Sequence, residues 1–221
     1  MDAADRGVKL TPMRRLVIVG AGGHGREIYE LAAVLRDQSG GWELAGFVAD
    51  EVPDLSLLDR MGARYLGGLD ELSQLDCEFI IGVGDCQTRR RIGDRLQNVR
   101  DRAASLVHPS AVVGRDVVLG RGVVITAGVV VTTNVTLGDH THLNVRSSVS
   151  HDCRLGQFVT VSPGATVCGS VNLADRVYVG AGACLKQGVT VGPDTMIGAG
   201  AVVVADAGPG LTLVGVPARP R

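Results

Sequence analysis

The sequence is poor in aromatic residues, has no long apolar run and carries almost no net charge. Phe, Trp and Tyr make up 3% of the 221 residues, while Gly numbers 31. This balance fits a narrow rod filled by aliphatic side chains better than a globular core, which normally uses large rings. The net charge of −1 points to no nucleic-acid partner. Without a run of about 18 apolar residues, no membrane-spanning helix is predicted.

The cysteines form no C-x-x-C pair and show no disulfide spacing. We therefore expect reduced thiols in a cytoplasmic protein. Residues 1–13 have no apolar stretch ahead of a cleavage site, so a flexible tail is expected there rather than a signal peptide. The five cysteines are Cys77, Cys86, Cys153, Cys168 and Cys184.

A six-residue repeat runs from Ala111 to Asp206 for sixteen hexads. One apolar residue at a fixed short period predicts a parallel β-helix over 107–206, closed by a cap at 207–221. Such a rod has no deep pocket, so an active site is expected where rods or domains meet. The third residue of every hexad is Val, Ile or Leu: Val113, Leu119, Ile125, Val131, Leu137, Leu143, Val149, Leu155, Val161, Val167, Leu173, Val179, Leu185, Val191, Ile197 and Val203.

Residues 14–106 show a different sequence pattern, in which predicted apolar strands alternate with predicted helices. This alternation predicts a small parallel α/β sheet. The expected strands are 16–19, 42–48, 79–83 and 103–107, and the expected helices are 26–39, 70–75 and 88–97. A segment of this size is half of a dinucleotide-binding fold, with room for a mononucleotide.

A glycine loop follows the first predicted strand and opens the first helix. Gly20, Gly22 and Gly25 satisfy G-x-G-x-x-G, a pattern in which the backbone and the helix N-terminus hold a diphosphate. A ligand-free turn is an alternative, and nicotinamide binding is disfavoured because half of the dinucleotide fold is missing. Asp50 ends the second strand, where it could meet a ribose or base, and His24 lies inside the loop.

Three histidines fall within the repeat. His140 at a corner and His142 at an outward position are both expected on the surface. His151 also points outward, but Asp152 follows it, and a carboxylate can hold one imidazole nitrogen protonated and make the other more basic. If three hexads make one coil, Gly169 lies directly above His151, where its N–H could stabilise a tetrahedral oxyanion. No Ser or Cys shows a nucleophile-elbow context, which favours direct attack by the acceptor.

Five blocks of the sequence together resemble a known family. They are VIVGAGGHG at 17–25, IGVGD at 81–85, SSVSHDC at 147–153, SPGA at 162–165 and GVPA at 215–218. In this order they are similar to the NeuD-type sugar acyltransferases, which are left-handed β-helix proteins, and most of all to the bacterial UDP-4-amino-sugar N-acetyltransferases. The resemblance implies a homotrimer with sites between neighbouring rods, acetyl-CoA as acyl donor and no metal.

The resemblance also implies roles for individual residues. His151 would be the general base and Asp152 would orient it, in place of the Glu of the relatives. The nucleotide sugar would be held by Gly22, Gly23, His24, Asp50, Gly84 and Asn144. Acetyl-CoA would lie near Thr160, Gly169, Ala181 and Ala199.

The sequence departs from the family pattern at two positions. Relatives tend to carry a second histidine, which touches acetyl-CoA, where this chain has Thr160. They also have paired aspartates where this chain has Ala49 and Asp50, so the nucleotide could be UDP-, GDP- or CMP-linked.

Acetyl transfer to the amine of a nucleotide-linked 4-amino sugar is the function that the sequence favours. O-acetylation of a sialic acid or another sugar hydroxyl is the alternative within the same class. A non-catalytic scaffold that binds nucleotide sugars is the alternative from a different class, and a nicotinamide-linked redox protein is a fainter third.

Overall fold

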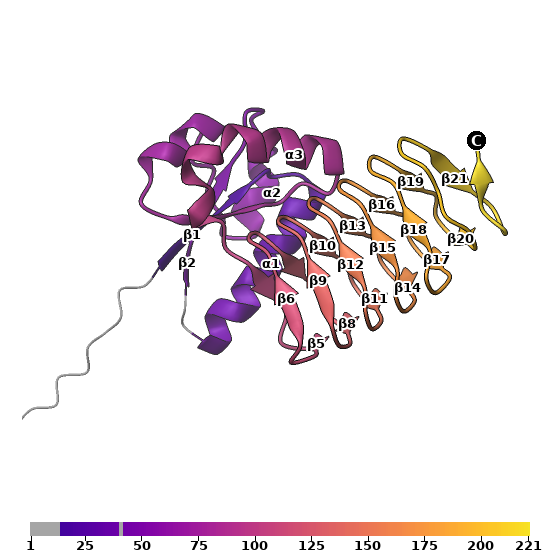
Figure 1. Cartoon of the computed structure of the whole chain (residues 1–221). Coiled ribbons are helices and arrows are strands. Elements are labelled where there is room, and N and C mark those ends of the chain that lie inside the picture. Colours follow the sequence, from indigo (N-terminus) through magenta and orange to yellow (C-terminus); the bar gives the residue numbers. More distant parts are fainter. Residues whose placement is uncertain (1–13, 40–41) are drawn as a thin grey trace, which may run out of the picture.

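The computed structural model describes residues 14–39 and 42–221, and the tail expected at 1–13 lies outside them. Figure 1 shows a small α/β domain followed by a tapering solenoid of stacked coils, with the C-terminus at the far end. This is the predicted fold class: a half-Rossmann domain and a left-handed parallel β-helix.

The α/β domain is built on a three-stranded parallel sheet with the order β2-β1-β3. Its strands are β1 (Arg14–Val19), β2 (Trp42–Val48) and β3 (Glu78–Ile81), and they are buried because helices cover both sides. The helices are α1 (Gly23–Ser39), α2 (Leu55–Arg60) and α3 (Cys86–Arg95), with the 3₁₀ helices η1 (Leu69–Gln74) and η2 (Gln97–Arg102). The sequence analysis missed α2.

The strand expected at 103–107 is only partly a strand of this domain. Leu106 and Val107 form β4, which pairs with β7 in the first coil of the solenoid. Ala103 makes a single bridge to Phe79 of β3. The chain therefore passes from one sheet to the other within four residues, and this leaves no flexible linker between the two parts.

The solenoid has three faces, and each residue pairs with the residue 18 positions further along the chain, as His142 does with Thr160. One coil is thus three hexads, which is the condition under which Gly169 was expected above His151. The first face contains β4 (Leu106–Val107), β7 (Val124–Ile125), β10 (His142–Leu143), β13 (Thr160–Val161), β16 (Tyr178–Val179), β19 (Met196–Ile197), β21 (Thr212–Val214) and β22 (Arg219–Pro220).

The other two faces contain only short strands. The second face is β5 (Val112–Val113), β8 (Val130–Val131), β11 (Ser148–Val149), β14 (Thr166–Val167), β17 (Cys184–Leu185) and β20 (Val202–Val203). The third face is β6 (Val117–Leu119), β9 (Val135–Leu137), β12 (Arg154–Leu155), β15 (Asn172–Leu173) and β18 (Thr190–Val191). We call the turns that follow these faces the first, second and third corners.

Most corners contain a residue with positive φ at the sixth hexad position. Glycine takes this conformation without strain and Asn or Asp with little. Larger residues also stand there, including His140 (φ 56°), Phe158 (φ 57°) and Arg176 (φ 60°), which follow one another up the third corner. The third corner therefore carries a column of large side chains, which the α/β domain uses as a docking surface.

The hairpin of β21 and β22 closes the C-terminal end of the solenoid. Its Leu213 and Ala218 join the aliphatic core that the third-position residues form along the rod.

The α/β domain packs on the first face, and its core continues onto the solenoid. Val124 of β7 is fully buried in one cluster with Ile28 and Leu31 of α1. His142, next above Val124 on that face, is 0% exposed, and His140 at the third corner is 7% exposed. The expectation that both histidines lie on the surface is therefore wrong, because the docked domain covers positions that would face solvent on a bare rod.

Candidate active site

The glycine loop joins β1 to α1, and its glycines do two different jobs. A Cβ on Gly25 would collide with the carbonyl oxygen of Gly20, so these two residues allow the helix to pack closely on the strand. Gly22 and Gly23 have nothing within 4 Å of where a Cβ would be, and both are exposed. The open side of the loop is thus at the start of α1, where backbone N–H groups and the helix dipole favour an anion.

A groove of about 1040 Å³ runs from this loop along the first face. Four of the predicted site residues lie together on its wall: Gly23, His24, Gly84 and Asn144. Thr160 lines it too, and further along it passes Ser162, Pro163, Tyr178 and Met196. A cleft between two packed domains is a common place for a ligand-binding site.

His24 is held on both sides. Its Nδ1 lies 3.0 Å from Oε2 of Glu27, one turn along α1, and its Nε2 lies 3.1 Å from Nδ1 of His142 on β10. Burial lowers the pKa of His24 below its usual value, and the neighbouring Glu27 offsets part of that effect. Burial lowers the pKa of His142 much further. Burial therefore favours the neutral form of both rings.

Thr160 and Gly84 are joined by hydrogen bonds. The Thr160 hydroxyl donates to the Gly84 carbonyl at 3.0 Å and accepts from Arg89 Nη2 at 2.9 Å and from Cys86 Sγ at 3.3 Å. Its hydrogen-bonding capacity is thus used within the protein. The sequence departure at Thr160 places a small side chain there, which ties the loop after β3 to the solenoid.

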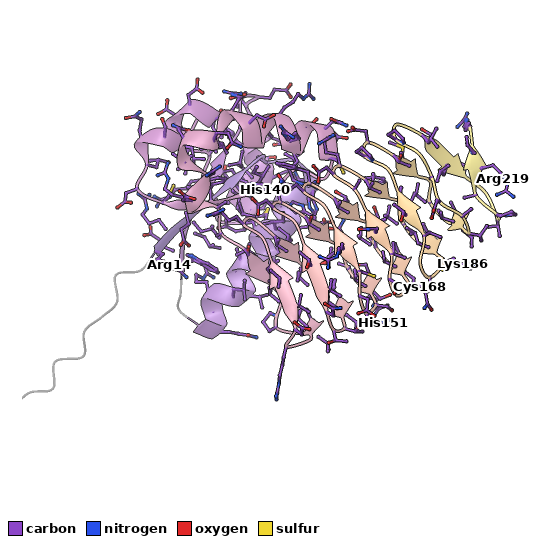
Figure 2. All side chains as sticks on the ribbon, viewed as in Figure 1. Arg14, His140, His151, Cys168, Lys186 and Arg219 are labelled. Carbon is purple, nitrogen blue, oxygen red and sulfur yellow. The ribbon has the colours of Figure 1, made fainter. Side chains whose placement is uncertain are left out.

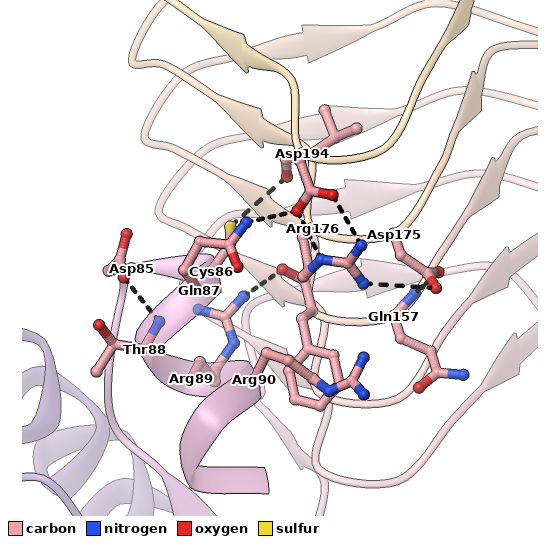
Figure 3. A network of polar contacts seen from close by, with 12 residues as sticks. Asp85, Cys86, Gln87, Thr88, Arg89, Arg90, Gln157, Asp175, Arg176 and Asp194 are labelled. Atoms are coloured by element: carbon pink, nitrogen blue, oxygen red, sulfur yellow. Dashed lines mark hydrogen bonds and ion pairs between the residues drawn. The ribbon is translucent and has the colours of Figure 1, made fainter. Parts of the chain in front are cut away.

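Arg89 is the main polar link between the two parts (Figure 3). It is completely buried, and burial lowers the pKa of its guanidinium to about 10. Its nitrogens donate to the carbonyls of Val83, Gly84, His140, Phe158 and Val159 and to the hydroxyl of Thr160, at 2.7–3.1 Å.

Sequence reasoning missed Arg89 because it stands in a run of three arginines, Arg89 to Arg91, that looks like a solvated helix face. It also missed Glu27 and His142. The sequence feature that could have identified His142 is its position 18 residues, or one coil, before Thr160. That spacing becomes informative only when it is known that the α/β domain covers this face of the solenoid.

His151 and Asp152 lie at the second corner, away from the α/β domain. Figure 2 shows His151 on the outer edge of the solenoid, whereas His140 lies against the domain. His151 Nδ1 is 2.7 Å from Asp152 Oδ2, and Asn134 Nδ2 donates to Asp152 Oδ1 at 2.6 Å. The hydrogen bonds from His151 and Asn134 hold the pKa of the Asp152 carboxyl below its usual value. A carboxylate can only accept, so the His151 proton lies on Nδ1 in this contact and Nε2 is left unprotonated in the neutral ring.

Gly169 stands beside His151, one coil further along. A Cβ at Gly169 would collide with Cε1 and Nε2 of the imidazole, so the ring lies flat over this glycine. The side chains of His151 and Asp152 are each about half exposed, at 50% and 49%. Neither residue lines the groove.

Four other predicted residues lie near the groove or outside it. Gly22 belongs to the open side of the glycine loop. Ala181 and Ala199 are exposed at the first corner, in the column above Pro163, and are joined by the bond from Gly200 N to Ala181 O. Asp50 accepts a hydrogen bond from Leu69 N and pairs with Arg95, and it does not line the groove.

Within the described residues no group of three His, Cys, Asp or Glu side chains could hold a metal ion. The same ranges contain no helix long and apolar enough to cross a membrane.

Residues 15–96 match the PglD N-terminal domain family. The acetyltransferase domain of PglB from Neisseria gonorrhoeae FA1090, solved in complex with acetyl coenzyme A, is 34% identical. The match covers 95% of this chain and 100% of that one, with a TM-score of 0.86. The chain belongs to the PglD-type sugar acetyltransferases. PerB from Caulobacter crescentus, in complex with CoA and GDP-perosamine, is 32% identical over 93% of this chain and 96% of that one, with a TM-score of 0.82.

A curated member of the family is the UDP-N-acetylbacillosamine N-acetyltransferase of Bacillus subtilis (strain 168). It is 32% identical over 109 residues, and the match spans 47% of each protein. The family predicted from the five sequence blocks is thereby confirmed.

Proposed function

We propose that this protein transfers the acetyl group of acetyl-CoA to the amine of a nucleotide-linked 4-amino sugar, and that it acts as a homotrimer. Acetyl-CoA and nucleotide sugars are cytoplasmic metabolites, so the proposal also places the enzyme there. The relatives solved with acetyl coenzyme A and with CoA plus GDP-perosamine support both substrates.

The groove divides naturally between the two substrates. The diphosphate would lie on the backbone N–H groups at Gly22 and Gly23, and the sugar would extend past Gly84 toward Asn144. Asp50, at the end of β2, lies on the side where the ribose and base would extend. The acetyl-CoA arm would follow the first face past Thr160 and along the first corner, where Ala181 and Ala199 leave the backbone accessible.

A single copy cannot complete this site. A general base must come within about 3 Å of the proton that it removes, but His151 is at the second corner and the groove follows the first face. A neighbouring copy in a trimer would bring its second corner to this groove. The separation of His151 from the groove is the observation that carries the proposal of a trimer with sites between copies.

The chemistry is direct acyl transfer. The neutral amine attacks the thioester carbonyl while His151 Nε2 takes the amine proton. The N–H of Gly169 would stabilise the tetrahedral oxyanion. The C–S bond then breaks, and the imidazolium returns the proton to the departing thiolate. Asp152 stabilises the imidazolium while it exists, as an ionised carboxylate beside a histidine does in other acyl-transfer sites.

The test is release of free thiol from acetyl-CoA on addition of UDP- or GDP-linked 4-amino sugars, with product mass confirming N-acetylation. We expect turnover with one of them and a loss of about 10²–10⁴-fold in kcat for His151→Ala at saturating substrates. Near-normal turnover in that variant would remove His151 from the mechanism. Binding of a nucleotide sugar without thiol release would instead identify a scaffold.

A further inference from the structure

The Glu27–His24–His142 chain crosses the junction between the nucleotide loop and the solenoid. We propose that His142 is a positioning residue for the nucleotide sugar: through its hydrogen bond it fixes the neutral His24 ring and so sets the glycine loop at a constant distance from Asn144. The inference deepens the proposed function and rests on it.

The hydrogen bonds determine where each proton lies. Glu27 is an acceptor, so Nδ1 of His24 carries the proton and its Nε2 is left as an acceptor. Nδ1 of His142 must then donate to it across 3.1 Å. The remaining nitrogen, Nε2 of His142, is buried with no partner in the part of the chain that the structure describes. A proton there would be an unpaired buried donor, so the same tautomer follows independently.

The charged groups around the pair keep it neutral. His142 is fully buried, and its pKa is lowered first by that burial and then by Arg89, His24 and His140. His24 is 16% exposed, and its surroundings combine burial and Arg89, which disfavour a charge, with Glu27, which favours one. A neutral His24 with both nitrogens engaged has no N–H to offer a phosphate. The diphosphate is then bound by the backbone at Gly22 and Gly23, and the histidine pair determines where that backbone stands.

The positions of His24 and His142 in the chain explain why a displacement of the two rings would change the substrate-binding groups on either side. His24 is the residue directly after Gly23 in the loop. His142 lies two residues before Asn144, on the same strand and turn. The contact between the rings, whose centroids are 5.3 Å apart, thus links the glycine loop directly to the strand that leads to Asn144.

The first test needs no substrate. Nitrogen-15 NMR of histidine side chains in the full-length protein should show His24 and His142 neutral from pH 6 to 8, both protonated on Nδ1. A charged His24 at pH 7, or a proton on Nε2 of either ring, overturns the inference. This outcome is independent of whether the protein transfers acetyl groups.

The second test is kinetic, with whichever UDP- or GDP-linked 4-amino sugar is turned over. His142→Ala should raise the KM for that sugar about tenfold, the loss of roughly one buried hydrogen bond, and leave the KM for acetyl-CoA unchanged. His142→Asn keeps an N–H donor at the position of Nδ1 and should recover most of the affinity. His140→Phe is the matched control, because it replaces a buried histidine of the same segment that does not touch His24, and its sugar KM should stay normal.

Equal increases in both KM values for His142→Ala, or no rescue by Asn, would reduce His142 to a general packing role and overturn the inference. If neither sugar is turned over by the wild type, it is the proposed function that fails. The tautomers measured by NMR would still test the hydrogen bond between His24 and His142.

Discussion

At the scale of single residues, the second corner holds His151, the proposed base, beside Asp152 and Asn134. Asp152 occupies the sixth hexad position with φ 61°, which turns its carboxylate back toward the His151 ring. Asn134, one coil earlier, holds the second carboxylate oxygen. Asn134 and Asp152 thus occupy equivalent positions of adjacent coils, and His151 directly precedes Asp152 in the same hexad.

Replacing Asp152 by Asn should leave the ring in place, but with Oδ1 still held by Asn134 it turns an amide N–H donor toward His151 Nδ1 and so favours the wrong tautomer. We expect kcat to fall by about 10²–10⁴-fold, as for a lost acid–base function. Asn134→Ala removes only the hydrogen bond to the carboxylate and should cost about tenfold or less. Steady-state kinetics on both variants checks this order, and an Asn134 effect as large as that of Asp152 would contradict it.

His140 should make the protein less stable in acid. Burial lowers its folded-state pKa from 6.5 to about 4, so between these values the unfolded chain binds a proton that the folded protein does not. Stability is therefore full above about pH 6.5 and falls as the pH drops toward 4. Over that interval the loss from this residue is about 2–3 kcal/mol.

His140→Phe should abolish that part of the pH dependence. Phenylalanine preserves the stacking on Phe158, whose ring centroid lies 5.0 Å from that of His140, and Phe158 itself shows that the corner conformation admits this residue. Urea unfolding at pH 7.5 and 4.5 measures the difference. Between pH 7.5 and 4.5 the wild type should lose more stability than the variant. Equal losses would show that His140 titrates normally in the folded state.

At the scale of elements, α3 determines how the two parts of the molecule meet. It lies along the column of large residues at the third corner. Gln87 donates to Asp194, which in turn receives a two-pronged ion pair from Arg176 at 2.6 and 2.8 Å (Figure 3). Gly93 leaves room for Phe158, because a Cβ there would come within 2.9 Å of the ring.

Two adjacent arginines on α3 allow this docking to be tested. Arg89→Met should destabilise the protein by about 3–5 kcal/mol, because it leaves several buried carbonyls without a donor. Arg90→Met removes a guanidinium that lies 5.7 Å from the Phe158 ring centroid and pairs with Asp94 near the surface, so it should cost less than about 1 kcal/mol. Chemical denaturation of both variants gives the change in the free energy of unfolding. Equal changes would show that Arg89 does not hold the two parts of the molecule together.

The elements also show what the sequence could predict. The hexads and the 18-residue coil could be predicted because every coil has to bury the same kind of side chain at the same place. The glycine loop could be recognised because close packing of α1 on β1 demands Gly20 and Gly25. The burial of His140 and His142 could not be predicted. It depends on which face of the solenoid the α/β domain covers, and that face is determined by contacts of Arg89 and the third corner that have no recognisable local sequence pattern.

At the scale of the whole molecule, His151, the proposed base, does not line the groove of its own copy, so the proposed function requires assembly for catalysis. A pair of complementary variants tests this. His151→Ala removes the base and leaves the groove intact. Gly23→Leu fills the open side of the glycine loop and leaves the second corner intact, and it should fold because nothing lies within 4 Å of the added Cβ.

Each variant alone should be inactive, whereas mixed trimers from co-expression should recover activity. In a mixed trimer of either composition one of the three interfaces pairs an intact groove with an intact His151, so the isolated mixed species should reach about a third of the wild-type specific activity. Purification on two different affinity tags, followed by size-exclusion chromatography, isolates the mixed species. The control is a mixture of the separately purified variants whose subunits have not exchanged. If each copy held a complete site, every subunit in the mixture would lack one component and no activity would return.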